Sequence, residues 1–318
     1  MSSDEPGRSV SADHPTAGDA RVSRPTHLGA DGLAAVDRLV VAATATDAVA
    51  PLSEHALLHL RAETGEDAAH LLVHRGDDLV AVAHVDLAHD GEPASAELVV
   101  HPDHRRQGVG TLLLHEVEAA ARSGSGDDVR VWAHGDIAAA RRFAADRGYQ
   151  VVRELWQMAR PLTEPLPALV VPDGFRLRAF EPGADDDRWL AVNAAAFAHH
   201  PEQGAWTATD LDQRIAAPWF DPAGFLLLVD ESTGQLAGFH WTKEHGGGVG
   251  EVYVVGVAPA YQGRGLAKPL TLAGLHHLRA RGLSTVILYV DGDNAAAVRT
   301  YSGLGFDRSA LDVQYARG

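Results

Sequence analysis

Two short segments have the residue types of an anion-binding loop. Residues 105–110 read Arg-x-x-Gly-x-Gly and residues 262–267 read Gln-x-x-Gly-x-Ala, and a run with helical periodicity follows each of them. Small residues at these positions let backbone N–H groups face outward at a helix N-terminus, where the positive end of the helix dipole also favours a pyrophosphate. Neither segment has the Gly-Lys-Ser/Thr of a Walker loop or the third glycine of a dinucleotide-binding loop. One such segment is weak evidence, but two in register indicate a duplicated phosphate-binding unit.

The register of the two segments extends beyond them. Three pairs of landmarks are each separated by 157 residues: Pro102 and Pro259, Gly108 and Gly265, and Gly148 and Gly305. A common fold alone would tolerate changes in loop length between such landmarks. The constant separation therefore favours a duplicated domain.

The elements that must position these loops follow the same order in both halves. The first half predicts helices at 33–41, 53–60 and 136–147, a helix ending near 122, and strands at 70–74, 79–87, 94–100, 129–133 and 151–158. The second half predicts helices at 187–198, 209–217 and 294–304, a helix ending at 281, and strands at 175–180, 225–229, 236–242, 251–258, 285–290 and the C-terminal end. We therefore expect an α/β fold of two tandem domains, each with a mixed, mostly antiparallel sheet flanked by helices.

Composition and charge exclude several classes of protein. The 318 residues include 27 Lys and Arg against 43 Asp and Glu, a formal net charge of −16, which argues against a nucleic-acid partner. There is no cysteine, so disulfides and thiolate chemistry are excluded. No apolar run approaches the roughly 18–20 residues of a membrane span, and the polar start lacks the apolar core of a signal peptide. We expect a cytoplasmic monomer without membrane contact.

The chain divides into four segments. Residues 1–25 are polar and lack periodicity, which predicts a disordered tail. Residues 26–160 form the expected N-terminal domain and residues 173–318 the expected C-terminal domain. Residues 161–172 between them contain four prolines, which is typical of a linker.

The loop pattern after the fourth strand of each half resembles the pyrophosphate loop of the GNAT superfamily of acetyl-CoA-dependent N-acetyltransferases. The run from Asn294 through Tyr301 to Gly305-Phe306 resembles that superfamily's later cofactor-contacting helix. Segments 200–204 (His-Pro-Glu-Gln-Gly), 239–243 (Phe-His-Trp-Thr-Lys) and 250–254 (Gly-Glu-Val-Tyr-Val) are similar to the mycothiol synthases, a family of tandem GNAT enzymes. That family transfers acetyl from acetyl-CoA to the cysteinyl amine of cysteinyl-glucosaminyl-inositol, which the resemblance implies as the substrate here.

Two polar residues of the second half suit amine acetylation. An amine attacks a thioester only when unprotonated, so a modest base suffices for an α-amino group, and an acid helps the departing thiolate. We expect Glu251 to be the base and Tyr301 the acid. The separation of 157 residues places Ala94 and Ala144 opposite them in the first half.

The internal comparison predicts chemistry in the second domain only. Ile137 stands opposite Asn294, and Glu97 lies an odd number of residues from Ala94, so we expect its side chain on the other face of the strand. The first domain would then bind acetyl-CoA without catalysing its transfer, or contribute to the substrate surface.

The resemblance implies that acetyl-CoA contacts the fourth strand, the loop and a later helix. In the second domain these residues are Val255, Gly256, Val257, Gln262, Gly263, Arg264, Gly265, Leu266, Ala267, Lys268, Asn294, Ala295, Ala296, Ala297, Val298 and Arg299. In the first domain they are Leu98, Val99, Val100, Arg106, Gln107, Gly108, Val109, Gly110 and Thr111. A glycine inside a strand weakens it, so we also expect a bulge at Gly256.

The resemblance also implies the substrate-binding residues, and alternatives stay open. The substrate residues are Glu54, Glu202, Lys243, Glu251 and Tyr289. The 18 histidines include the adjacent pairs 199–200 and 276–277 but no HExxH motif, so we expect no metal. The alternatives are a tandem acetyltransferase for another amine, such as an antibiotic or a protein N-terminus, and a non-catalytic acetyl-CoA sensor.

Overall fold

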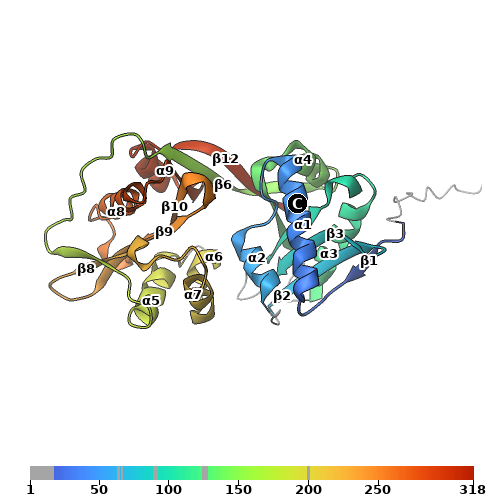
Figure 1. The fold of residues 1–318 in the computed structure, drawn as a ribbon, viewed down its shortest axis with the longest axis horizontal. Coiled ribbons are helices and arrows are strands. Elements are labelled where there is room, and N and C mark those ends of the chain that lie inside the picture. Colours follow the sequence, from blue (N-terminus) through green and yellow to red (C-terminus); the bar gives the residue numbers. More distant parts are fainter. Residues whose placement is uncertain (1–17, 63–64, 66, 89–91, 124–127, 199–200) are drawn as a thin grey trace, which may run out of the picture. The chain divides into compact units, whose positions relative to one another are not determined.

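The computed structural model describes residues 18–62, 65, 67–88, 92–123, 128–198 and 201–318. Its contacts divide the chain into two compact units (Figure 1). The first unit is Met1–Val152 together with Gln314–Gly318, and the second is Arg153–Val313. This division differs from the predicted domain bounds. The reason lies in strand pairing, because residues 155–161 pair antiparallel with residues 285–291 of the second unit.

Among the described residues, five strands lie entirely within the first unit, in sequential order. They are β1 (Arg21–Ser23), β2 (Ala68–Arg75), β3 (Asp78–Asp86), β4 (Ala94–Val100) and β5 (Val129–Ala133). The pairs from β1 to β4 are antiparallel, and β4 and β5 are parallel. Strand β1 falls within the predicted tail: its three backbone positions pair with Leu72, Val73 and His74, which corrects the prediction for residues 21–23. The tail's residues 1–17 lie outside the described residues.

Helices cover both faces of this sheet. Helices α1 (Ala30–Asp47) and α2 (Glu54–Arg61) pack on the face that carries Leu72, Val82 and Val99. Helix α3 (Val109–Ser123) packs on the opposite face, against alternate residues of the same strands. Ser53 caps α2, as its sequence position predicts, and its hydroxyl accepts a hydrogen bond from the Ala56 N–H. Helix α4 (Ala138–Ala145) then leads into β6 (Tyr149–Pro161).

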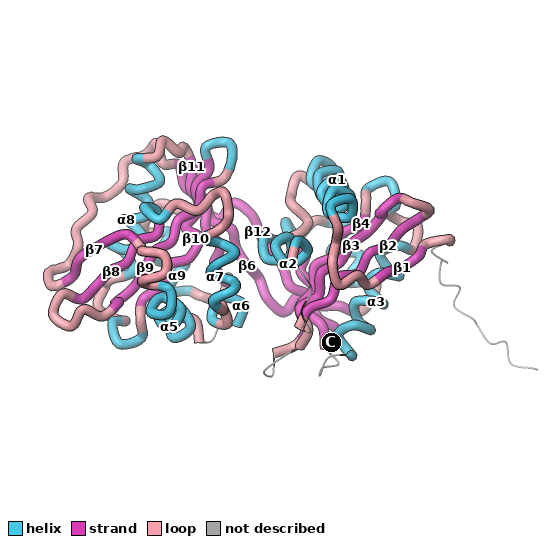
Figure 2. Tube along the Cα trace, turned by 60° about the horizontal axis from the view of Figure 1, so that its bottom comes forward, coloured by secondary structure: helices cyan, strands magenta, loops and turns pink. Residues whose placement is uncertain are grey.

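The second unit repeats this arrangement. Its sheet order is β12 (Asp307–Arg317), β6, β11 (Thr285–Asp291), β10 (Val249–Val257), β9 (Leu236–Glu244), β8 (Phe225–Asp230) and β7 (Phe175–Ala179). Its helices are α5 (Asp186–Ala196), α6 (Pro201–Gly204), α7 (Ala208–Ile215), α8 (Ala267–Ala280) and α9 (Ala295–Ser302). Figure 2 shows the strands and the flanking helices of each unit in different colours. The expected α/β class with a mixed sheet is confirmed.

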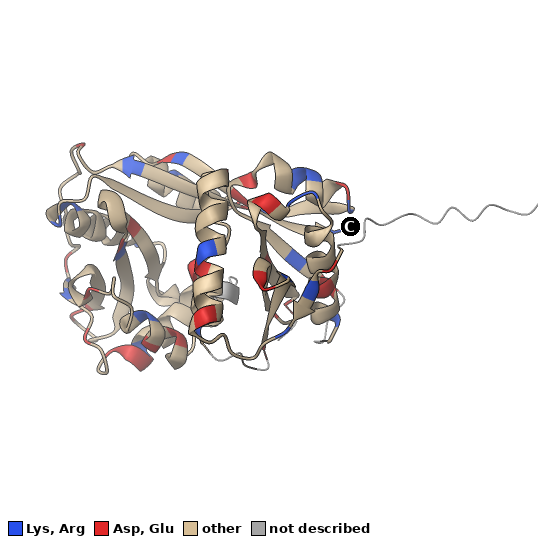
Figure 3. Cartoon of the chain, turned by 45° about the vertical axis from the view of Figure 1, so that its right-hand side comes forward, with Lys and Arg blue, Asp and Glu red and all other residues tan. Residues whose placement is uncertain are grey.

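The second core is more aromatic than the first. Trp189, Phe225, Phe239 and Trp241 are fully buried between α5, α7 and the sheet. Basic and acidic positions are interspersed along the ribbon in the view of Figure 3. Among the described residues, no helix is both long and apolar enough to cross a membrane.

Candidate functional site

In each unit the fourth strand has an open edge along part of its length. The parallel pairing of β4 with β5 covers residues 94–97, and that of β10 with β11 covers residues 249–252. Beyond these points, and among the described residues, residues 98–100 of β4 pair with β3 alone and residues 254–257 of β10 pair with β9 alone. The opposite backbone edge can therefore receive an extended, amide-containing ligand as an added strand. The predicted contacts with the cofactor arm lie on these edges.

The two predicted loops have matching geometry in atomic detail. A short 3-10 turn precedes each loop, at Pro102–His104 and at Pro259–Tyr261. The first loop residue then donates a side-chain hydrogen bond to the carbonyl five residues earlier. Arg105 Nε lies 3.1 Å from the Val100 oxygen, and Gln262 Nε2 lies 3.3 Å from the Val257 oxygen. Both bonds tie the loop to the end of the open strand edge.

Two positions of each loop adopt left-handed backbone. Gly108 and Gly265 have φ of 81° and 75°, as expected where only glycine avoids a steric penalty. The position two residues earlier is also left-handed, at Arg106 with φ of 60° and Gly263 with φ of 75°. A Cβ built at Gly263 or Gly265 would meet no atom within 4 Å, so these glycines serve the backbone conformation and leave open space outside it.

The helix after the second loop begins without a side-chain cap. Its N-cap residue is Leu266, and within the part of the chain that the structure describes this position makes no side-chain capping hydrogen bond. Uncapped amides next to open space are the donors that a pyrophosphate requires. Arg264 and Lys268 are exposed nearby in sequence, and the Arg264 guanidinium lies 4.9 Å from the centre of the Tyr261 ring. The residues of this loop fit the pyrophosphate of acetyl-CoA.

The first unit has a large cavity at its own loop and open strand edge. Its volume is about 730 Å³. Seven of the nine predicted cofactor residues of this unit line it: Leu98, Val99, Val100, Arg106, Gly108, Gly110 and Thr111. Of the other two, Val109 is buried in the core, and the Gln107 side chain hydrogen bonds to Arg75 and to the Asp103 carbonyl.

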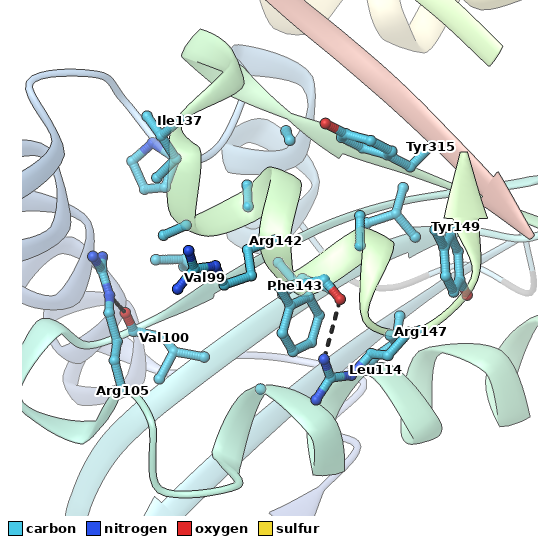
Figure 4. Close-up of a pocket in the computed structure, with 18 of the residues that line it drawn as sticks. Val99, Val100, Arg105, Leu114, Ile137, Arg142, Phe143, Arg147, Tyr149 and Tyr315 are labelled. Atoms are coloured by element: carbon cyan, nitrogen blue, oxygen red, sulfur yellow. Dashed lines mark hydrogen bonds between the residues drawn. The ribbon is translucent and has the colours of Figure 1, made fainter. Parts of the chain in front are cut away.

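The cavity combines an apolar wall with cationic groups. Figure 4 shows Val99, Leu114 and Phe143 beside Arg105, Arg142 and Arg147. Arg147 donates to Thr111 Oγ1 at 2.5 Å, and its guanidinium lies 3.8 Å from the centre of the Phe143 ring. Arg105 forms two hydrogen bonds with the Asp47 carboxylate, at 2.8 and 2.7 Å, so its charge is already paired. The cavity suits a molecule with an apolar arm and an anionic end.

One extra residue in β10 changes the comparison between the units. The β9–β10 register shifts between Val252 and Val254, so the bulge lies at Tyr253, whereas we predicted it at Gly256. Gly256 is explained by close packing instead, because a Cβ there would lie 2.8 Å from Phe239 Cε1. The Tyr253 hydroxyl accepts a hydrogen bond of 2.9 Å from Arg214 Nε on α7.

The bulge also corrects the predicted counterpart of Glu251. Glu251 pairs with Lys243 and Ile287, and the residue in the corresponding place of the first unit is Ser95, which pairs with Asp86 and Arg130. The predicted counterpart, Ala94, is therefore one residue off. The three landmarks separated by 157 residues all follow the bulge in the chain and could not reveal it.

Glu97 lies on the face of β4 opposite to Ala94, as predicted, but this is the face of Ser95, the actual counterpart of Glu251. It is 8% exposed. Its carboxylate accepts hydrogen bonds from the Ser53 N–H at 2.5 Å and the Ser53 hydroxyl at 2.6 Å, and His134 Nε2 lies 3.3 Å away. Burial opposes ionisation, but the hydrogen bonds from His134 and Ser53 outweigh it and hold the pKa of Glu97 below its ordinary value. The two hydrogen bonds from Ser53 thus hold this carboxylate at the N-terminus of α2.

The buried carboxylate of the second unit has different surroundings. Glu251 is 7% exposed, and its Oε2 lies 2.6 Å from His245 Nε2. His245, which sequence reasoning missed, also lines a cavity of about 570 Å³ together with Trp219 and Arg281. The contact forms across the turn between β9 and β10, and no motif in the sequence signals it. His245 thus connects Glu251 to an open cavity.

Three of the five predicted substrate residues come together on neighbouring strands. Lys243 on β9 lies opposite Glu251 in the register, and its Nζ is 4.6 Å from the centre of the Trp219 ring. Tyr289 lies on β11, two residues after the partner of Glu251, and so on the same face. Loss of hydration and the charge of Glu251 raise the pKa of Tyr289 to about 12, against a hydrogen bond from Gln157 that lowers it.

The other two predicted substrate residues lie in separate elements. Glu54 is the first residue of α2, in the first unit, and is half-buried. Glu202 falls in α6, and its side chain lies outside the described residues, as does the histidine pair 199–200.

Helix α9 carries the predicted acid. Tyr301 packs against the core of the second unit, with its ring centre 5.9 Å from that of Phe306, and burial raises its pKa to about 12. At neutral pH its hydroxyl therefore keeps its proton and can donate it. Among the described residues, no side chain or backbone group hydrogen bonds to this hydroxyl. Asn294 caps α9, and its Oδ1 accepts from the Ala297 N–H at 3.1 Å.

Comparisons with known proteins agree with this geometry. Residues 189–306 match the model of the acetyltransferase (GNAT) family, and residues 66–151 match that of an acetyltransferase (GNAT) domain. A mycothiol acetyltransferase of Thermobispora bispora is 53% identical over 89% of this chain and 95% of its own. One of Nocardia farcinica is 51% identical over 94% of this chain and 98% of its own.

The similarity to solved structures extends over the sequence of both units. A GCN5-related N-acetyltransferase from Sphaerobacter thermophilus is 26% identical, with a TM-score of 0.68, over 94% of this chain and 95% of its own. A tandem GNAT protein from the clavulanic acid biosynthesis pathway is 19% identical, with a TM-score of 0.73, over 93% and 98% of the two chains. The latter similarity concerns the fold alone.

Proposed function

The chain belongs to the mycothiol acetyltransferases, tandem members of the GNAT superfamily, and we propose that it acetylates the cysteinyl amine of cysteinyl-glucosaminyl-inositol with acetyl-CoA. The observation that carries the residue assignment is the buried carboxylate of Glu251 beside the open edge of β10 and the uncapped loop before α8. A base, a thioester arm and a pyrophosphate cradle then lie along one strand and the turn that follows it.

Acetyl-CoA supplies the activated acetyl group as a thioester. Residues 255–257 and the amides of residues 262–268 would hold its pantetheine arm and pyrophosphate. Glu251 accepts the proton that the attacking nitrogen loses as the new C–N bond forms. Tyr301 donates its proton to the sulfur as the C–S bond breaks, so that the products are the amide and free CoA. The proton balance between the two residues is restored by solvent.

Substitution of the two proposed catalytic residues tests this assignment. Glu251→Gln keeps the shape of the side chain but removes its basicity, and Tyr301→Phe removes only the hydroxyl. We expect each to lower kcat by roughly 10²–10⁴-fold, the usual contribution of one proton-transfer group, while acetyl-CoA still binds. The measurement is acceptor-dependent release of CoA from the purified full chain.

The matched control is Glu231→Gln, which removes an exposed carboxylate in the turn after β8. It should leave kcat unchanged. Activity that survives in the Glu251→Gln, Tyr301→Phe double variant would overturn the assignment. Faster release of CoA with another amine would contradict cysteinyl-glucosaminyl-inositol as the acceptor. Absence of release with every amine would indicate an acetyl-CoA sensor.

A further inference from the structure

The first unit contains a cluster of imidazole and carboxylate groups that the proposed acetyl transfer does not use. His55 and His59 lie four residues apart on α2, and His84 and Asp86 lie two residues apart on β3, so each pair shares one face of its element. One ligand atom from each of these four residues lies within 4.8 Å of the other three. We refer to these four residues as the His–Asp cluster.

The distances within the His–Asp cluster are close to those of a metal site. His55 Nε2 and His84 Nε2 both lie 3.0 Å from Asp86 Oδ1. The rings of His55 and His59 have their centres 4.1 Å apart, and the His59 and His84 ring centres are 5.2 Å apart. Ligand atoms around a tetrahedral Zn²⁺, with bonds of about 2.0–2.1 Å, lie about 3.3 Å from one another. The four ligand atoms of the cluster lie within 4.8 Å of one another, so a bound ion would draw the more distant of them closer.

His84 is the buried member of the His–Asp cluster, and hydrogen bonds through His70 orient its ring. His70 Nε2 lies 3.1 Å from the carbonyl oxygen of His59, which can only accept, so this nitrogen carries a proton. His70 is 1% exposed, which favours its neutral form and leaves its Nδ1 as an acceptor. His84 Nδ1 lies 3.3 Å from that atom and therefore donates to it.

The proton on His84 Nδ1 determines what its other ring nitrogen, Nε2, presents to Asp86. A neutral His84 that carries its proton on Nδ1 points the lone pair of Nε2 at Asp86 Oδ1, 3.0 Å away. Two lone pairs at that distance repel each other unless a cation, either a metal ion or a second ring proton, lies between them. A metal-bound histidine usually donates a hydrogen bond from its other ring nitrogen in this way. Such a bond from Nδ1 fixes the ring and leaves Nε2 for the metal.

We propose that the His–Asp cluster is a structural binding site for one divalent zinc-class ion, held by His55, His59, His84 and Asp86. Three imidazoles and one carboxylate are a donor set that suits Zn²⁺. The His84 side chain is 1% exposed, whereas those of His55 and Asp86 are 42% and 33% exposed, so an ion has a path from solvent. The ion would cross-link α2 to β3. This proposal departs from the sequence-based expectation of no metal.

The second unit shows that the fold does not itself require this cluster. The positions that correspond to His84 and Asp86 on β9 are Trp241 and Lys243, where the separation of 157 residues holds. Trp241 is fully buried and stacks on Phe225, with ring centres 4.3 Å apart. The second unit thus has a buried aromatic ring and a lysine at these two positions, where the first unit has two potential metal ligands.

Binding of Co²⁺ to the full chain, purified without a histidine tag and stripped with a chelator, tests the proposal. We expect one Co²⁺ per chain, with the strong visible absorption of a four-coordinate ion, and its displacement by one equivalent of Zn²⁺. His55→Gln and His59→Gln alter half-buried positions on α2 and should leave the fold intact. Because each variant removes a direct ligand, each should weaken Co²⁺ binding by more than roughly 10–100-fold. That is the usual cost of losing a hydrogen-bond partner of a ligand.

The control variant is Asp221→Asn. It alters the other group of potential ligands among the described residues, Asp221, Glu244 and His277, and should leave Co²⁺ binding unchanged. Three outcomes would overturn the proposal: no visible band, a band that persists in His55→Gln and His59→Gln, or loss of the band in Asp221→Asn. None of these measurements depends on acetyl transfer.

Discussion

At the scale of single residues, the two units use a buried carboxylate in different ways. Glu251 contacts His245 beside an open cavity, whereas Glu97 accepts two hydrogen bonds from Ser53 and lies against His134. The residue type and its place on the fourth strand could be recognised in the sequence. The partners could not, because Ser53 and His134 are brought to Glu97 from α2 and the end of β5 only by folding.

The stabilisation by Glu97 should depend on pH. Glu97→Gln weakens hydrogen bonds to a charged, buried group and should lower the free energy of unfolding by about 1–3 kcal/mol at pH 7. Because the folded-state pKa of Glu97 lies below its ordinary value of 4.5, this stabilisation is present above that pH and is lost as the pH falls through the folded-state pKa. Denaturant unfolding of both proteins between neutral and acidic pH measures the difference.

Glu116→Gln provides the control, since it removes an exposed ion pair with Arg24 and should change stability by less than about 1 kcal/mol. A Glu97→Gln deficit that stays constant down to acidic pH would contradict the argument, because the deficit should shrink once the wild-type carboxyl is protonated.

At the scale of elements, prediction succeeded where a local pattern decides the structure. The predicted bounds 94–100 and 129–133 coincide with β4 and β5, because alternating apolar residues are bounded there by turn residues. Strand β1 was missed because its three residues have no apolar pattern and depend on pairing with β2. The bulge at Tyr253 was missed because it involves neither glycine nor proline. The second left-handed loop position was also missed, since Arg106 occupies it in the first unit.

Gly265→Ala tests whether the loop conformation serves the cofactor. Alanine at φ of 75° should cost about 1 kcal/mol of stability, and its methyl group would enter the open space beside the α8 amides. We expect the KM for acetyl-CoA to rise at least about tenfold, which is 1.4 kcal/mol of binding. Steady-state kinetics at saturating acceptor provide the measurement.

The control for this variant is Gly234→Ala, in the turn between β8 and β9. Its φ is 70° and its surroundings are equally open, so the backbone penalty should match. It should lower stability by a similar amount without changing the KM for acetyl-CoA. An equal rise of KM in both variants would assign the effect to stability alone.

At the scale of the whole molecule, duplication was readable from the constant separation of 157 residues, but the grouping of contacts was not. Prolines indicated a linker at 161–172, yet residues 153–160 group with the second unit and residues 314–318 with the first. Strand partners distant in sequence determine this grouping, and no local pattern reports them. The two His–Asp pairs were likewise visible as spacings, four residues on α2 and two on β3, but only the folded sheet brings them together.

The duplication predicts two acetyl-CoA sites that can be blocked one at a time. Ala139 is exposed and lines the cavity of the first unit, and Ala296 is the exposed residue 157 positions later on α9. A tryptophan at either position should fill its own site at little cost to the fold. Native mass spectrometry should count two acetyl-CoA molecules on the wild-type chain and one on Ala139→Trp or Ala296→Trp. Turnover should be lost in Ala296→Trp and retained in Ala139→Trp, because the proposed base and acid both lie in the second unit. If Ala139→Trp lost turnover but still bound two acetyl-CoA molecules, the cavity of the first unit would instead contribute to the reaction itself.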